Sequence, residues 1–84
     1  MKFTIKAIDA ISYEDSDDLE ERLKSFPGNT KVITKGDGWA DLEWSDTFEA
    51  DSEEEAKSKA SEYEANAWSV ESEDGSITFT EEDV

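Results

Sequence analysis

The side chains of this sequence that can do chemistry are almost all carboxylates. The chain has 84 residues, of which 24 are Asp or Glu and eight are Lys or Arg, and it contains neither His nor Cys. The absence of His removes the commonest general base near neutral pH, and the absence of Cys removes thiol nucleophiles, disulfides and zinc–thiolate sites. Three kinds of chemistry remain: acid–base catalysis by paired carboxylates, cation binding, and attraction to a basic partner.

The spacing of the acids does not support the first two kinds. The acidic segments 15–18, 46–55 and 71–74 lack the Asp-x-Asp-x-Asp-Gly pattern and the later bidentate Glu of a calcium loop. No glycine-rich phosphate-binding pattern occurs, and in Gly36-Asp37-Gly38 an acid would lie beside the phosphate. A domain of this size has little room for the apolar cleft that separates the pKa values of two catalytic carboxylates. The sequence predicts a protein that is not an enzyme and has no cofactor and no metal site.

The distribution of charge supports the third kind. The formal net charge is −16, and residues 36–84 hold seventeen acids against Lys57 and Lys59 alone, for a net charge of −15. Solubility requires a net magnitude of only about 2 to 8 in a small domain, and like charges within a Debye length of about 8 Å repel one another. Anionic membranes and nucleic acid would be repelled as well. The predicted partner is therefore the basic surface of another protein, typically one that binds nucleic acid.

A predicted hairpin positions part of this charge. The segments 31–35 and 39–50 flank Gly36-Asp37-Gly38, and glycine enters the turn conformations that hairpins require. In the second segment the even-numbered residues are apolar except for Asp46, so the odd-numbered ones face outward. Outward residues two apart lie about 7 Å from each other, which predicts an acidic row beside the acids that begin the next helix. The predicted partner-binding residues are Asp37, Trp39, Asp41, Glu43, Asp46, Glu49, Asp51, Glu53, Glu54, Glu71, Glu73 and Asp74.

Trp39 has the outward parity of this strand, beside Asp41 and Glu43. An exposed Trp among acids is suited to anchor a partner or to stack on an arginine. The alternative is that a neighbouring loop or the last hairpin covers it. The sequence leaves both open.

The first third of the chain predicts a strand and a helix. Alternation of apolar and polar residues indicates a strand over residues 2–13, with a bulge or a strand end near Ile8, where the alternation changes phase. Asp15 or Ser16 caps the following helix, whose apolar positions are Leu19, Leu23 and Phe26. Pro27-Gly28 ends it.

The last third predicts a second helix and a second hairpin. Ser52 and Glu55 fit a capping box, and Ala56, Ala60, Tyr63 and Ala67 follow at helical spacing. Residues 68–72 and 77–80 flank Glu73-Asp74-Gly75 as a hairpin, and residues 81–84 are expected to form a flexible acidic tail.

The fold class predicted from these elements is α+β, in the order β-α-β-β-α-β-β, as a single domain over residues 1–80. A small antiparallel sheet with two helices on one face, a ferredoxin-like sandwich, is the first choice, and other small α+β arrangements share the same order. The charged N-terminal segment and the lack of an apolar run of about 20 residues predict a cytoplasmic protein.

The segment 48–56, a strand leading into an acidic cap and an alanine-spaced helix, resembles small accessory proteins of phages and plasmids. Together with the net charge it is similar to acidic phage inhibitors, including anti-CRISPR and anti-restriction DNA mimics. The resemblance implies a stoichiometric inhibitor that places its acidic surface, residues 37 to 74, in the Lys/Arg-lined nucleic-acid channel of a host defence protein. One alternative is an accessory or assembly domain that binds a protein through its sheet and Trp39. Another is an acidic surface that only faces solvent or that reflects adaptation to salt.

Overall fold

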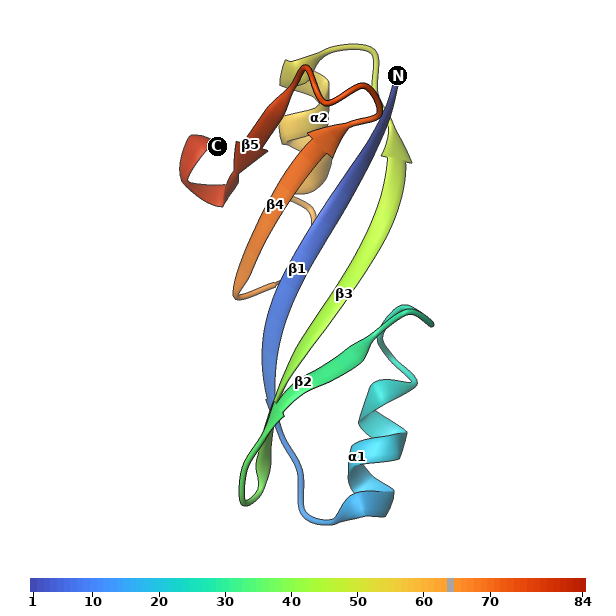
Figure 1. Cartoon of the computed structure of the whole chain (residues 1–84), viewed down its shortest axis with the longest axis vertical. Helices are drawn as coiled ribbons and strands as arrows, with labels where there is room; N and C mark the ends of the chain where they lie inside the picture. Colours follow the sequence, from blue (N-terminus) through green and yellow to red (C-terminus); the bar gives the residue numbers. More distant parts are fainter. Residues whose placement is uncertain (64) are drawn as a thin grey trace.

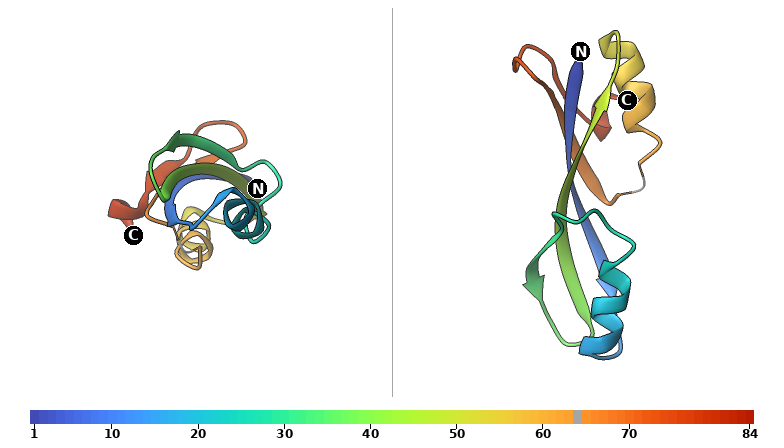
Figure 2. Two further views of the ribbon diagram at one scale, coloured as in Figure 1. Left: turned by 90° about the horizontal axis from the view of Figure 1, so that it is seen from below. Right: turned by 90° about the vertical axis from the view of Figure 1, so that its right-hand side faces the viewer.

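A curved antiparallel sheet runs the length of the molecule and carries both helices on one of its faces (Figures 1 and 2). The computed structural model describes residues 1–63 and 65–84, and within them the sheet has five strands in the order β2-β3-β1-β4-β5. The Cα atoms extend over 43 × 22 × 19 Å. The α+β class predicted from the sequence is confirmed. The elements are β1 (Lys2–Ser12), α1 (Ser16–Leu23), β2 (Lys31–Lys35), β3 (Trp39–Glu49), α2 (Glu53–Ala60), β4 (Ala67–Ser72), β5 (Thr78–Thr80) and a 3₁₀ helix (Glu81–Asp83).

The two long strands β1 and β3 pair without interruption from Lys2 opposite Glu49 to Ser12 opposite Trp39. The predicted bulge or strand end near Ile8 is therefore wrong. Ile8 points to the outward side of the strand and is 44% exposed, while Asp9 lies on the inward side. An apolar residue outside and an acid inside make the alternation appear to change phase in the sequence. The irregularity of the sheet lies instead in β2, between Val32 and Thr34.

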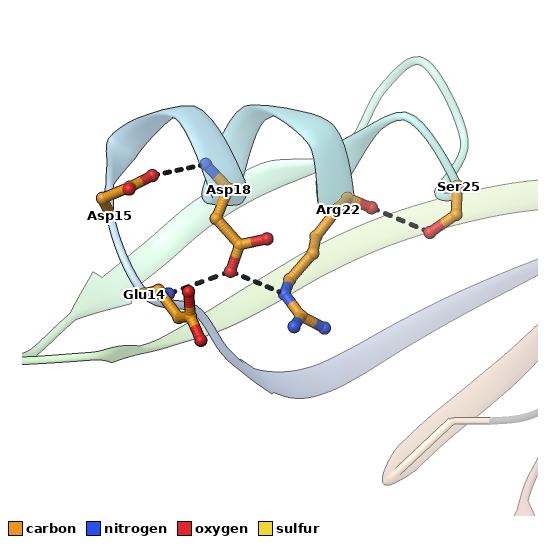
Figure 3. A network of polar contacts seen from close by, with 5 residues as sticks. All are labelled: Glu14, Asp15, Asp18, Arg22 and Ser25. Carbon is orange, nitrogen blue, oxygen red and sulfur yellow. Dashed lines mark hydrogen bonds and ion pairs between the residues drawn. The ribbon is translucent and has the colours of Figure 1, made fainter.

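Both helices begin at caps that the sequence identifies. At α1 the Asp15 carboxylate accepts the amide of Asp18 at 2.8 Å, and at α2 the Ser52 hydroxyl accepts the amide of Glu55 at 3.1 Å. Each cap satisfies a backbone donor that has no partner within its helix. Figure 3 shows the α1 cap.

The end of α2 differs from the prediction. The helix stops at Ala60, Tyr63 lies in the turn that follows, and Ala67 is the first residue of β4. The Tyr63 ring packs 5.8 Å from Trp44 and 6.2 Å from Phe48, measured between ring centroids. Its helical spacing from Ala60 therefore reflects burial against the sheet rather than a continuing helix.

Two hydrophobic clusters form on the helix-bearing face. The larger contains ten buried residues, among them Phe3, Ile5 and Trp68, and these ten come from β1, β3, α2, β4 and β5 and from Ala50 directly after β3. The smaller contains Leu19 of α1 with Ala40 and Leu42 of β3. The opposite face of the sheet, called the open face below, carries no helix (Figure 2).

The C-terminal residues pack on the sheet edge. Within the segment predicted as an acidic tail, Glu81, Glu82 and Asp83 form a 3₁₀ helix. The Glu81 carboxylate accepts the amide of Trp68 at 3.1 Å, and Asp83 accepts the amide of Thr80 at 2.9 Å. Within the described part of the chain, none of the helices has the length and apolar character needed to cross a membrane.

Candidate functional site

The predicted acidic row lies on the open face, but lysines are interleaved with it. Asp41, Glu43 and Glu49 share the outward side of β3, as their parity predicts. Lys31 of β2 lies opposite Glu43, and Lys2 of β1 lies opposite Glu49. The net negative charge of this face is therefore lower than the acids alone indicate.

A second group of acids gathers where β1 begins and β3 and β4 end. The Met1 carbonyl accepts the amide of Ala50 at 3.0 Å, and the Lys2 carbonyl accepts the amide of Glu73 at 2.9 Å. In Figure 1 the N-terminus, the start of α2 and the β4–β5 turn all lie at this end of the molecule. We call it the acidic end, and its members are Glu49, Asp51, Glu53, Glu54, Glu73 and Asp74.

The twelve predicted residues do not form one patch. The β3 strand has eleven residues, so its two ends are about 33 Å apart at the usual rise per residue. Asp37, Trp39, Asp41 and Glu43 lie toward the far end from Glu49, and Glu71 lies on the open face opposite Thr4. The prediction grouped these acids because they are close in sequence. The extended β3 strand, however, places the acids at its two ends far apart.

Asp46 lies on the other side of the sheet. It has the inward parity of β3, and its carboxylate accepts the Tyr63 hydroxyl at 3.0 Å and the Thr47 amide at 2.8 Å. Burial of the Tyr63 phenol and its hydrogen bond to this carboxylate raise the pKa of Tyr63. Asp46 therefore orients the Tyr63 ring.

Hydrogen bonds hold two other acids in the ionised form. Asp74 accepts the Ser76 hydroxyl at 2.7 Å, the Ser76 amide at 3.0 Å and the Ser72 hydroxyl at 2.9 Å, which lowers its pKa to about 2. The Glu14 amide, at 2.9 Å, and the Arg22 side chain, at 3.1 Å, lower the pKa of Asp18 in the network of Figure 3. Both carboxylates bind neighbouring donors, and in residues 1–63 and 65–84 no group of three or more acids is arranged to hold a metal ion.

Trp39 is 44% exposed on the open face. Its ring lies over Gly36, where an added Cβ would be 2.1 Å from the Trp39 Cε2 atom. The Tyr13 hydroxyl donates to the Gly36 carbonyl at 3.1 Å, so the turn beneath the indole is tied to the end of β1. The last hairpin forms the opposite edge of the sheet from β2. Trp39 is thus a supported, accessible aromatic side chain.

The sequence did not identify a hollow of about 580 Å³ on the helix-bearing face, lined from both halves of the chain. In its lining the Asp9 carboxylate accepts the Trp44 indole N–H at 3.0 Å and the Asn66 amide at 3.1 Å. The available signal was Asp9 itself, an acid at an inward position of an otherwise apolar strand face. The lining residues are Asp9, Ile11, Phe26, Tyr63, Ala65 and Asn66.

The open face has two larger, adjoining depressions of about 600 and 630 Å³ over β1, β4 and β5, which share Lys6, Ser69 and Thr80. Their lining includes the acids Glu43, Glu71 and Glu82 as well as Lys2 and Lys6. This mixture of charges matches an ordinary solvated sheet face more closely than a site for a single kind of ligand.

Comparison of the chain with protein-family models, with curated proteins and with solved structures gave no match.

Proposed function

We propose that this protein is a non-enzymatic, stoichiometric inhibitor that mimics nucleic acid. In this role it occupies the Lys/Arg-rich nucleic-acid-binding site of a host defence protein, such as a CRISPR effector or a restriction nuclease, in the cytoplasm. Shape and charge together support the proposal. A net charge of −16 over a length of 43 Å gives roughly one negative charge per 2.7 Å, compared with about one per 1.7 Å along duplex DNA. The extents of 22 and 19 Å across the long axis give the body a slender, duplex-like outline.

The acidic end is the proposed leading contact. Glu49 and Glu73 lie where β3 and β4 end, and backbone hydrogen bonds from Ala50 to Met1 and from Glu73 to Lys2 hold these ends to β1. Charges presented on a preformed framework bind at a smaller entropic cost than charges on a flexible segment. Complementary charge would also accelerate the encounter with a basic channel.

The experiment measures binding to a basic nucleic-acid-binding protein in competition with its nucleic acid. Affinity is expected to fall steeply between about 50 and 200 mM salt, as phosphate-mediated binding does. Replacing Asp41, Glu43, Glu49, Asp51 and Glu53 by Asn or Gln should weaken competition strongly. Competition that is independent of salt, or that survives these substitutions, would overturn the proposal.

A second candidate is an accessory or assembly domain that binds a protein through its sheet. The observation that favours it is the exposure of Trp39, at 44%, together with Val32 at 39% and Ile33 at 47% on the neighbouring edge strand. Trp39→Ala separates the candidates, because it should abolish binding through the sheet and weaken charge-based binding only slightly.

For the fold we propose the ferredoxin-like sandwich. The order β2-β3-β1-β4 with antiparallel neighbours supports this assignment, and β5 then adds an edge strand to it.

A further inference from the structure

We propose that the hollow between the two helices binds the guanidinium group of an arginine side chain from a protein partner. The inference rests on the function proposed above, because a nucleic-acid-binding channel presents arginines. It assigns a specific subsite on the helix-bearing face, apart from the acidic end. The hollow has a volume of about 580 Å³ and is bounded by residues of β1, of the loop after α1 and of the loop after α2.

A guanidinium site first requires a carboxylate that can accept further hydrogen bonds, and Asp9 is such a carboxylate. Its two oxygens each accept one hydrogen bond, from the Trp44 Nε1 at 3.0 Å and from the Asn66 amide at 3.1 Å. An ionised carboxylate has about four lone-pair positions, so each oxygen retains capacity for a further donor. Both existing donors are neutral and hold the carboxylate in one orientation.

Asp9 is also a carboxylate that none of the ion pairs among the described residues includes. It is half-buried on the strand face that otherwise carries Ile5, Ala7 and Ile11. The ion pairs of residues 1–63 and 65–84 lie elsewhere: Met1 with Glu49, Arg22 with Asp18, Lys24 with Glu21, and Lys59 with Glu55. A charge in a partly apolar site is stabilised by an opposite charge that can also donate hydrogen bonds.

The second requirement is a flat aromatic surface, and the hollow has two aromatic side chains in its lining. The Tyr63 ring is fixed by its hydroxyl, which donates to Asp46 at 3.0 Å, and by packing against Trp44 and Phe48. Phe26 packs against both hydrophobic clusters and is therefore also restrained. Arginine stacks on aromatic faces while its planar group donates to a carboxylate, so this pairing of groups suits it.

The same features disfavour other ligands. An anion would be repelled by Asp9, and among the described lining residues a metal ion would find one carboxylate, where sites normally supply several ligands. A lysine ammonium carries the right charge, but it is strongly hydrated and lacks the planar surface that stacks on Phe26 or Tyr63. Arginine is therefore expected to bind more tightly than lysine.

The experiment compares a six-arginine peptide with a six-lysine peptide by NMR titration of the full chain. The Trp44 indole N–H donates to Asp9 and serves as the reporter of this site. The arginine peptide is expected to shift this resonance and to bind at least about tenfold more tightly than the lysine peptide. Equal affinities for the two peptides, or an unchanged indole resonance, would overturn the proposal.

Asp9→Asn is the variant that tests the carboxylate. It removes one charge while keeping an oxygen that can accept the Trp44 indole, and it should reduce affinity for the arginine peptide about tenfold. The matched control is Asp17→Asn, which removes the same charge from an exposed position in the first turn of α1, outside the predicted partner-binding residues, and should change affinity less than twofold. Equal losses in the two variants would show that only net charge matters. If Asp9→Asn fails to fold, Phe26→Leu decides, with a several-fold loss expected for arginine and none for lysine.

These measurements distinguish failure of the subsite from failure of the proposed function. If the chain competes with nucleic acid but the indole resonance does not respond to arginine, the mimic stands and the subsite is wrong. If arginine binding depends on Asp9 but no nucleic acid is displaced from basic proteins, the subsite stands and the mimic is wrong.

Discussion

The two ends of the sheet are stabilised in different ways. At the α2 half, made of α2, β4, β5 and the adjoining parts of β1 and β3, ten buried residues form one cluster. At the α1 half, made of α1, β2 and the other ends of β1 and β3, only three do. Ala56 and Ala60 of α2 are fully buried, whereas Leu19 is the buried residue of α1. The α2 half therefore contains the larger share of the buried apolar residues.

Short-range polar contacts hold α1 and the residues at its two ends. Asp18 accepts the Glu14 amide and the Arg22 side chain, and the Ser25 hydroxyl donates to the Arg22 carbonyl at 2.8 Å (Figure 3). All five residues of the edge strand β2 are exposed. Regions with few buried apolar contacts open at a lower free energy than the rest of a domain. The α1 half is therefore expected to be the less stable part of the molecule.

The largest expected effect is that of Ile5→Ala in the α2 half. Ile5 is completely buried in the larger cluster, and truncating a buried Ile to Ala costs about 2 to 5 kcal/mol. That is a large fraction of the roughly 5 to 15 kcal/mol that stabilises a whole domain. Urea denaturation followed by circular dichroism should show a much lower midpoint, and amide exchange should accelerate in both halves.

Leu19→Ala is the counterpart in the α1 half. It truncates a residue that is 7% exposed in the cluster of three, so exchange is expected to accelerate in α1 and β2 while β4 keeps its protection. Equal loss of protection across the sheet would mean that the two halves unfold as one unit, and the comparison would then be wrong.

An intermediate effect is expected from Gly36→Ala at the turn of the α1 half. The new methyl group would lie 2.1 Å from the Trp39 ring, so the indole must move, at a cost of about 1 to 3 kcal/mol. The displaced Trp39 indole should become more exposed, so the fluorescence should shift to the red. Trp44 and Trp68 stay buried and should contribute an unchanged signal. Gly28→Ala is the control, because no atom beyond its two chain neighbours lies within 4 Å of the added methyl, and it should leave the spectrum unchanged.

A smaller effect is expected from removing the helix caps. Ser52→Ala and Asp15→Ala each leave one backbone amide without its side-chain acceptor, which costs about 1 kcal/mol. In the α2 half this loss should lower the stability of the whole domain. In the α1 half it should appear mainly as faster amide exchange within α1. A reversed pattern would show that α1 is coupled to the core more tightly than its burial indicates.

Local patterns of the sequence predicted much of the fold. The alternation in β3 identified its buried even-numbered residues, and Gly38 and Gly75 adopt positive φ angles of 80° and 76° in the two predicted turns. The caps at Asp15 and Ser52 were also recognisable, because capping depends on residues only three positions apart.

What depends on pairing between distant segments was not predictable. Glu49 and Glu73 are far apart in the sequence but are brought to one end by β1, which lies between their strands. Conversely, Asp41 and Glu49 are close in sequence but separated by strand length. The hollow was missed because Phe26 and Tyr63 were both assigned to helices, whereas each lies in the turn after a helix.

The smallest expected effect concerns two carboxylates, one from each half. Hydrogen bonds from Ser76 and Ser72 lower the pKa of Asp74 to about 2, from an ordinary 3.8. Hydrogen bonds from the Glu14 amide and the Arg22 side chain also lower the pKa of Asp18. A folded-state pKa below the unfolded value adds stability above about pH 4, which is lost as the pH falls toward 2. Titration of the side-chain carboxyl carbons by NMR should show both midpoints below 3.8. Ser76→Ala should raise the midpoint of Asp74 and leave Asp18 unchanged; if neither carboxyl responds, the serine hydroxyl does not cause the shift.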